Sequence, residues 1–170
     1  MRTVNFIGGR FNPLSIKHYD IISNMLNYDG KSIIFIIDGE KSSMDKNKNP
    51  LSGPERKEVI KSCFPMATVD ICSNIFQCLD ILDIMGFDHL RWFCGSDREE
   101  NYKKISLNFD GNIEIHSIKR DDNISATKIR EGIITGKNIS HLLPTLKNDI
   151  KIKVEGIIKN ASTNNTIRSR

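Results

Sequence analysis

The sequence predicts an α/β fold built on one parallel sheet. Two observations favour this fold: short β-rich runs alternate with segments of helical periodicity, and a predicted helix lies between most consecutive strand-like runs. With 170 residues, of which 38% are hydrophobic, the chain can bury one good core and is too short for two ordinary domains. We therefore expect one domain over residues 1–159.

Five short apolar segments are expected to be the strands, because each is rich in β-branched residues and is bounded by turn-forming or polar residues. They cover residues 3–7, 32–37, 68–72, 89–94 and 113–118.

Two short amphipathic helices are expected at residues 19–26 and 55–63. Pro54 lies at a first-turn position of the second helix, and Pro65 stops it. The long loop at residues 39–53 is rich in Lys, Ser and Asn, and a loop of this length in a compact domain is more often functional than not.

The clearest helix follows Ser73, a good N-cap, and ends at Gly86, with apolar residues around nearly all of its surface. The remaining helices are expected after Asp97, which is a candidate cap, over residues 127–134, and from Pro144 onward.

The net charge of +4 is modest, and a solvated surface explains it about as well as a nucleic-acid footprint does. Aromatic residues make up only 7% of the chain, and no stacking motif is present, so we do not expect nucleic acid as a partner. Beyond residue 160 the chain has a single large aliphatic residue, so we expect residues 160–170 to be a disordered polar tail.

Neither a membrane segment nor a secretion signal is legible. No apolar stretch approaches the roughly 20 residues that span a bilayer, and the N-terminus lacks a signal-peptide core. We therefore expect a cytoplasmic protein without a membrane partner. The cysteines form no C-x-x-C pair, which argues against a zinc ribbon or a redox pair and favours buried reduced thiols; they are Cys63, Cys72, Cys78 and Cys94.

The junction after the first predicted strand is a glycine-rich turn that leads into a helix. Small residues such as Gly8 and Gly9 let the backbone approach a phosphate, and the free N–H groups of a helix start favour negative charge. His18, one turn into the helix, would donate to a phosphate oxygen and stabilise charge in a transition state. The alternatives are an ordinary tight turn and a structural histidine.

A second cluster follows the fifth strand and opens a helix. Ser125, Thr127, Lys128 and Arg130 combine hydroxyl donors with two cations, which suits a polyphosphate. The alternatives are helix caps and a solvated basic face.

A third cluster follows the fourth strand, where open α/β sheets place ligand loops, and consists of Gly95, Ser96 and Asp97. All three clusters fall at carboxyl ends of strands in one sheet, which predicts one shared crevice.

At this point the sequence resembles a known family. Residues 9–18 resemble the G-x-F-[DN]-P-x-[HT]-x-G-H signature of the HxGH-type nucleotidyltransferases, and residues 124–130 resemble their I-S-S-T-x-I-R signature. Residues 49–56 are similar to their P-[LF]-[ST]-x-x-E-R segment, residues 95–97 to the G-[SA]-D of the nicotinate-mononucleotide branch, and residues 136–144 to their D-[VI]-S-x-[LYF]-[VL]-P.

The resemblance implies a Rossmann-like five-stranded parallel sheet of order 3-2-1-4-5 with helices on both faces, and a nucleotide lying across the first and fourth strands. It also implies transfer of a nucleoside monophosphate, with AMP from ATP favoured, to a phosphorylated acceptor such as nicotinamide mononucleotide. Pyrophosphate would leave after in-line attack, Mg²⁺ would arrive with the NTP, and the protein itself would supply no metal site.

The resemblance assigns the roles of the family's signature residues to the matching positions of this sequence. His18 and Arg130 would be catalytic. The nucleotide would be held by Gly8, Gly9, Arg10, Phe11, Asn12, Ser15, Lys17, Ser125 and Thr127, and the acceptor by Gly95, Ser96 and Asp97. A cation in the loop after the second strand would contact phosphate, and the candidates are Lys41, Lys46 and Lys48.

Three positions depart from the signatures. Ser15 replaces the first His, as Thr does in the phosphopantetheine adenylyltransferases, and Ala126 replaces the second Ser of I-S-S-T. Lys17 replaces the Gly of HxGH and motivates the alternative of a catalytically silent nucleotide-binding relative. A cytidylyltransferase that uses CTP is the other alternative. Relatives often form trimers, tetramers or hexamers, so the resemblance also allows a homo-oligomer.

Overall fold

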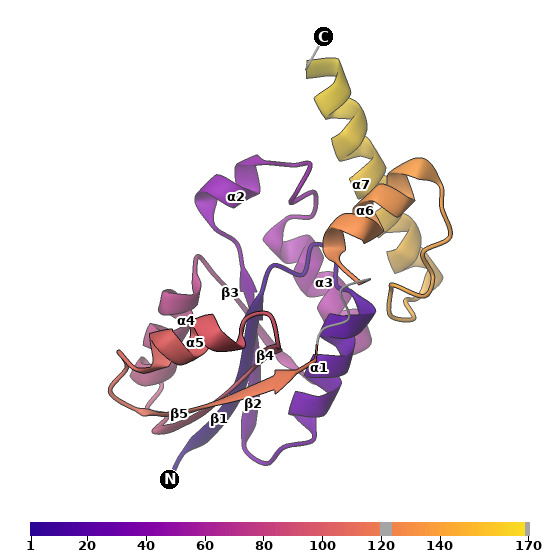
Figure 1. Cartoon of the computed structure of the whole chain (residues 1–170). Helices are drawn as coiled ribbons and strands as arrows, with labels where there is room; N and C mark the ends of the chain where they lie inside the picture. The colour runs from indigo at the N-terminus through magenta and orange to yellow at the C-terminus, as the bar shows by residue number, and fades with distance from the viewer. Residues whose placement is uncertain (120–123, 169–170) are drawn as a thin grey trace.

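The computed structural model describes residues 1–119 and 124–168 and contains the expected parallel sheet (Figure 1). All four strand pairings are parallel, and the order is β3-β2-β1-β4-β5, which confirms the order that the resemblance implied. The strands are β1 (Thr3–Gly9), β2 (Lys31–Ile37), β3 (Thr68–Cys72), β4 (His89–Gly95) and β5 (Asn112–Ile118).

Helices cover both faces of the sheet, as expected. One core packs α1 (Ile16–Leu26), α3 (Gly53–Cys63), α6 (Ala126–Thr135) and α7 (Asn148–Arg168) against one face. The other core packs α4 (Ile75–Ile84) and α5 (Glu99–Ser106) against the opposite face. The alternation of side chains along a strand sends Ile33 and Phe35 to one core and Ile34 and Ile36 to the other, so β2 is buried on both sides.

Three expectations about α4 and α5 were wrong in detail. Asn74, not Ser73, caps α4 by accepting the N–H of Gln77 at 2.9 Å. The apolar surface of α4 is buried on one side only, since Phe76 and Ile84 are 59% and 85% exposed. Helix α5 begins at Glu99 with Arg98 at the cap position, so Asp97 lies in the turn before the cap.

The last helix also differs from the expectation. It begins at Asn148 rather than at Pro144, and it continues to Arg168, where we expected a tail without regular structure from residue 160. Residues 160–168 contain no Gly or Pro that would break the helix, and a helix that is already nucleated gains one hydrogen bond for each residue that it adds. Ile150, Val154 and Ile158 anchor α7 in the core, with Ile157 packed against it, and the far end of α7 projects from the body (Figure 1).

The loop after β2 contains a short helix, α2 (Glu40–Met44), which lies beyond the carboxyl edge of the sheet (Figure 1). No helix within the described residues is both long enough and apolar enough to cross a bilayer.

Candidate functional site

The two central strands part at the carboxyl edge of the sheet. The ladder between β1 and β4 ends at Phe6 and Trp92. By contrast, β1 stays paired with β2 as far as Gly9, and β4 stays paired with β5 as far as Gly95. The last three residues of β1 and β4 therefore open away from each other where the strand order reverses, which is where open α/β sheets bind ligands.

The glycine turn at this opening is tightly packed. A Cβ on Gly8 would lie 2.7 Å from Ile75 Cδ1, and a Cβ on Gly9 would lie 2.9 Å from the Phe11 ring. Phe11 itself is 2% exposed and has a positive φ of 50°. A Cβ at either position would therefore displace a neighbouring side chain of the protein, and the contact of the two glycines with a nucleotide stays a prediction.

Ser15 and His18 form a reciprocal cap at the start of α1. Ser15 Oγ accepts the backbone N–H of His18 at 3.2 Å, and His18 Nδ1 accepts the backbone N–H of Ser15 at 3.2 Å. Because Nδ1 is an acceptor here, the neutral ring carries its proton on Nε2. The Phe11 ring meets the imidazole edge-on at 5.0 Å and helps to fix its orientation. Ser15 is 2% exposed, so the structure gives it a capping and positioning role.

Arg130 brings the C-terminal motif to this turn. Its Nη1 donates to the carbonyl of Asn12 at 2.9 Å, and its Nη2 donates to Thr127 Oγ1 at 3.3 Å. Burial lowers the pKa of Arg130, but a guanidinium stays charged in any case. Ser125 caps α6 by accepting the N–H of Lys128 at 3.2 Å, while Thr127 is exposed. Two motifs that lie far apart in the sequence therefore meet at the crevice.

Asn12 holds the loop after β2 instead of pointing into solvent. Its side-chain amide donates to the carbonyl of Leu51 at 3.0 Å and accepts the N–H of Leu51 at 2.9 Å. The side chain is 2% exposed, so both of its polar groups are committed to this clamp.

Sequence reasoning missed the role of Arg56. Its guanidinium donates to the carbonyls of Arg10 and Ile37 at 2.9 Å each and to Asp38 Oδ1 at 2.6 Å, and its Nε donates to Ser52 O at 3.2 Å. One buried side chain thus ties together the turn after β1, the end of β2 and the start of α3. The P-[LF]-[ST]-x-x-E-R resemblance marked this residue but did not say what it holds.

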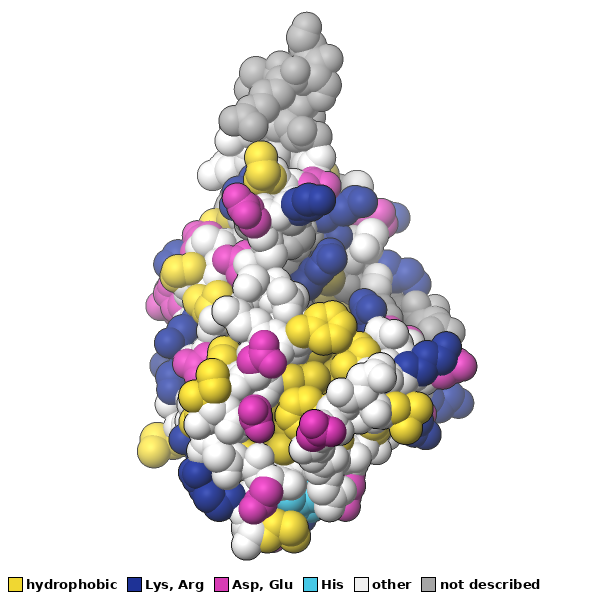
Figure 2. Space-filling model, turned by 90° about the vertical axis from the view of Figure 1, so that its left-hand side faces the viewer, with side chains coloured by type: hydrophobic (Ala, Val, Ile, Leu, Met, Phe, Trp, Pro, Cys, Tyr) yellow, Lys and Arg dark blue, Asp and Glu magenta, His cyan; other side chains and the backbone are white. Residues whose placement is uncertain are grey.

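The remaining predicted residues lie around this opening in less constrained positions. The N–H of Ser96 donates to the carbonyl of Ile118 at 2.8 Å, which fixes the loop after β4. Asp97 Oδ2 forms an ion pair with Arg98 Nε at 3.8 Å. Arg10 is exposed and Lys17 is half-buried. On the side of the molecule formed by α4 and α5, hydrophobic side chains gather around a hollow with Lys and Arg side chains above it (Figure 2).

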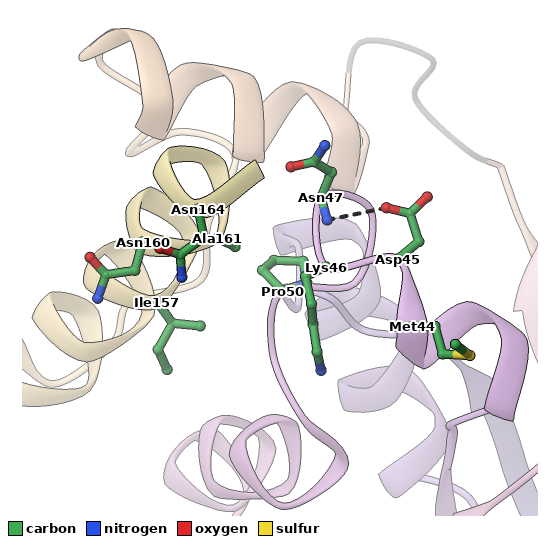
Figure 3. A pocket seen from close by; sticks show the side chains of 9 residues that line it. All are labelled: Met44, Asp45, Lys46, Asn47, Pro50, Ile157, Asn160, Ala161 and Asn164. Carbon is green, nitrogen blue, oxygen red and sulfur yellow. Dashed lines mark hydrogen bonds between the residues drawn. The ribbon is translucent and has the colours of Figure 1, made fainter. Parts of the chain in front are cut away.

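A cavity of about 350 Å³ lies elsewhere, between the loop after β2 and α7 (Figure 3). None of the predicted catalytic or acceptor residues lines it, although Lys46 does. Its walls are Met44, Asp45, Lys46, Asn47, Pro50, Ile157, Asn160, Ala161 and Asn164. Asp45, one of its wall residues, accepts the N–H groups of Asn47 and Lys48 through its Oδ1 atom at 3.2 and 3.3 Å. Lys41 and Lys48 are exposed.

Comparison with solved structures shows the same fold. The chain is similar to a candidate nicotinate-nucleotide adenylyltransferase from Vibrio parahaemolyticus, with a TM-score of 0.59 and 20% identity over 93% of this chain and 99% of that one. It is also similar to a bifunctional NMN adenylyltransferase/ADP-ribose pyrophosphatase from Francisella tularensis complexed with AMP and a manganese ion, with a TM-score of 0.68 and 18% identity. This match covers 98% of this chain and 54% of the bifunctional protein. A second structure of that protein gives a TM-score of 0.64.

No curated protein matches the chain significantly. The profile of the cytidylyltransferase-like family, however, matches residues 6–132. Because this match covers well over half of the sequence and includes both signature segments, the chain belongs to the cytidylyltransferase-like family of the HxGH-type nucleotidyltransferase superfamily.

Proposed function

We propose that the chain transfers AMP from ATP to a phosphorylated acceptor such as nicotinamide mononucleotide and releases pyrophosphate. The observation that carries the proposal is the bond from Arg130 Nη1 to the Asn12 carbonyl, 2.9 Å long, which joins the two signature segments beside His18. In support of the proposal, this bond fixes a cation at the turn after β1, the turn that leads to His18 and the start of α1, and such groups stabilise the charge of phosphates.

In the proposed reaction an oxygen of the acceptor phosphate attacks the α-phosphorus in line. The new P–O bond forms as the bond from the α-phosphorus to the bridging oxygen breaks, and the electron pair leaves with pyrophosphate. His18 Nε2–H donates to the phosphate oxygens on which charge builds up, and the Arg130 guanidinium neutralises that charge. The protein mainly positions the reactants, because phosphoryl transfer needs little covalent chemistry from it.

The proposal includes Mg²⁺ as an ion that arrives with the nucleotide. In the part of the chain that the structure describes, no three His, Cys, Asp or Glu side chains converge on a metal position. Mg²⁺ commonly binds through substrate phosphates, water and one or two carboxylates, so such a cage is not needed.

The loop from Gly95 to Asp97 is the proposed acceptor site, because it lies across the opening from the nucleotide turn. The structural neighbours are named as adenylyltransferases, which supports ATP as the donor, whereas the family is named for cytidylyltransferases, which keeps CTP as the alternative donor.

The test is a pyrophosphate-release assay with Mg²⁺ that crosses ATP and CTP against nicotinamide mononucleotide, nicotinate mononucleotide, phosphopantetheine and phosphocholine. Release with ATP and one mononucleotide is the expected result. Release with CTP alone would replace the donor, and no release in any combination would contradict the proposal.

If ATP raised the melting temperature without any turnover, the silent-binder alternative would take its place. Lys17→Gly would then be the decisive variant, because it restores the motif glycine. A gain of activity in Lys17→Gly would assign the silence to Lys17.

A further inference from the structure

Two buried thiols lie together at the carboxyl end of β3. Cys72 is the last residue of β3 and Cys78 lies near the start of α4, and they are 4% and 0% exposed. Both Sγ atoms reach the same carbonyl oxygen, that of Asn74, at 3.6 Å from Cys72 and 3.4 Å from Cys78. The two sulfurs therefore flank one carbonyl oxygen. The spacing of the cysteines in the sequence did not predict this pair.

The pairing makes the two thiols unequal. The hydrogen bond from Cys78 lowers the pKa of Cys72, whereas the same bond, together with burial, raises the pKa of Cys78. The thiolate is the reactive form of cysteine, so Cys72 is the attacking sulfur of the pair. Cys94 differs, because burial raises its pKa to about 12.

We propose that Cys72 and Cys78 are a modification site that forms a reversible disulfide with a hydroperoxide as oxidant. The Cys72 thiolate attacks one peroxide oxygen, which breaks the O–O bond and gives a sulfenic acid and a hydroxide or alkoxide. The Cys78 sulfur then attacks the Cys72 sulfur, so that the S–S bond forms, the S–O bond breaks, and the oxygen leaves as water with the Cys78 proton. The two sulfurs lose two electrons, which the peroxide takes up. A dithiol reductant reverses the reaction by exchange.

The disulfide would act on the nucleotide turn through two contacts. Ile75, which lies between the two cysteines in sequence, fills the space above Gly8. The carbonyl of Cys72 accepts the N–H of Asp38 at 2.8 Å, and Asp38 binds Arg56, which holds the turn after β1. Disulfide formation draws two adjoining sulfurs to about 2.0 Å and therefore shifts the start of α4 relative to β3. This coupling rests on the proposed function; the disulfide itself does not.

The experiment treats the reduced full chain with hydrogen peroxide and measures its intact mass, its alkylatable thiols after denaturation, and its thermal shift with Mg²⁺ and ATP. We expect the mass to fall by about 2 Da, with two of the four thiols lost, and dithiothreitol to restore both. The ATP concentration at half-maximal thermal shift should rise about fivefold or more, which is the lower end of ordinary coupling between sites. Cys78→Ala should abolish the loss of about 2 Da and leave Cys72 at most as a sulfenic acid, about 16 Da heavier. Cys94→Ala, the matched buried control, should still lose about 2 Da.

The disulfide between Cys72 and Cys78 would be overturned if all four thiols could still be alkylated after peroxide treatment. It would also be overturned if a disulfide still formed in Cys78→Ala. A disulfide that leaves the ATP concentration at half-maximal thermal shift unchanged would overturn the coupling between the disulfide and the nucleotide turn. If the reduced protein gave no response to ATP or CTP, the proposed function would fail and the coupling with it, while the mass measurement would still decide the disulfide.

Discussion

Replacing Arg56 with Met removes the central hydrogen-bond donor beneath the crevice while keeping a side chain of similar length. Arg56 is 2% exposed and its guanidinium makes four bonds: to the carbonyls of Arg10, Ile37 and Ser52 and to the Asp38 carboxylate. Met can make none of these bonds. Breaking a buried ion pair by removing one partner costs about 3–5 kcal/mol.

The loss should fall at the lower end of that range, because the Asp38 side chain is 27% exposed and water can solvate it once it is alone. We expect a loss of about 3 kcal/mol in the free energy of unfolding, which for a domain of this size lowers Tm by about 6–12 °C. The two loops that Arg56 ties together should also separate, so the KM for the NTP should rise.

Urea unfolding of the wild type, Arg56→Met and Lys57→Met would measure this effect. Lys57 is the exposed neighbour of Arg56 on α3, and its replacement should change stability by no more than about 0.5 kcal/mol. If Arg56→Met lost less than about 1 kcal/mol, the carbonyls would not depend on the guanidinium, and our view of Arg56 as the tie between the loops would be refuted.

Three further predictions follow from the same contacts. His18→Ala should lower kcat about 10²-fold or more in the pyrophosphate assay, since one transition-state donor is lost, while circular dichroism should show an intact fold; unchanged turnover would remove His18 from the mechanism. Asn12→Ala should cost about 2–3 kcal/mol in urea unfolding, because the loss of both amide bonds leaves buried backbone groups without partners; a negligible change would show that the clamp is dispensable. Hydrogen bonds from His116 and His89 hold the pKa of Glu114 below its ordinary value of 4.5. The stability that Glu114 adds is therefore present above pH 4.5 and is lost as the pH falls through the lower pKa of the folded state. Unfolding of Glu114→Gln should therefore depend less steeply on acid pH than unfolding of the wild type, and parallel profiles would contradict this reading.

The fold was predictable because it rests on local patterns that the chain repeats. The apolar runs at β2 and β4 are buried on both faces of the sheet, as continuous apolar strands should be, and a helix capped by a hydroxyl or an amide begins after three of the strands. Errors arose where neighbouring residues compete for one role. Ser73 and Asn74 are both good N-caps, and only the geometry of the chain leaving β3 selects Asn74.

By itself the sequence determined the α/β class, the carboxyl edge of the sheet as the position of the polar clusters, and the family to which the chain belongs, since motif order and residue type survive without coordinates. Only the tertiary structure decided what each polar side chain does. Asn12 and Ser15 are both buried and bind backbone groups of the protein, while their contact with a nucleotide stays a prediction. Arg56 and the Cys72–Cys78 pair acquire their roles from partners that the folded chain brings beside them. Hydrogen bonds act over about 3 Å, and closeness on that scale is set by how strands and helices pack rather than by spacing along the chain.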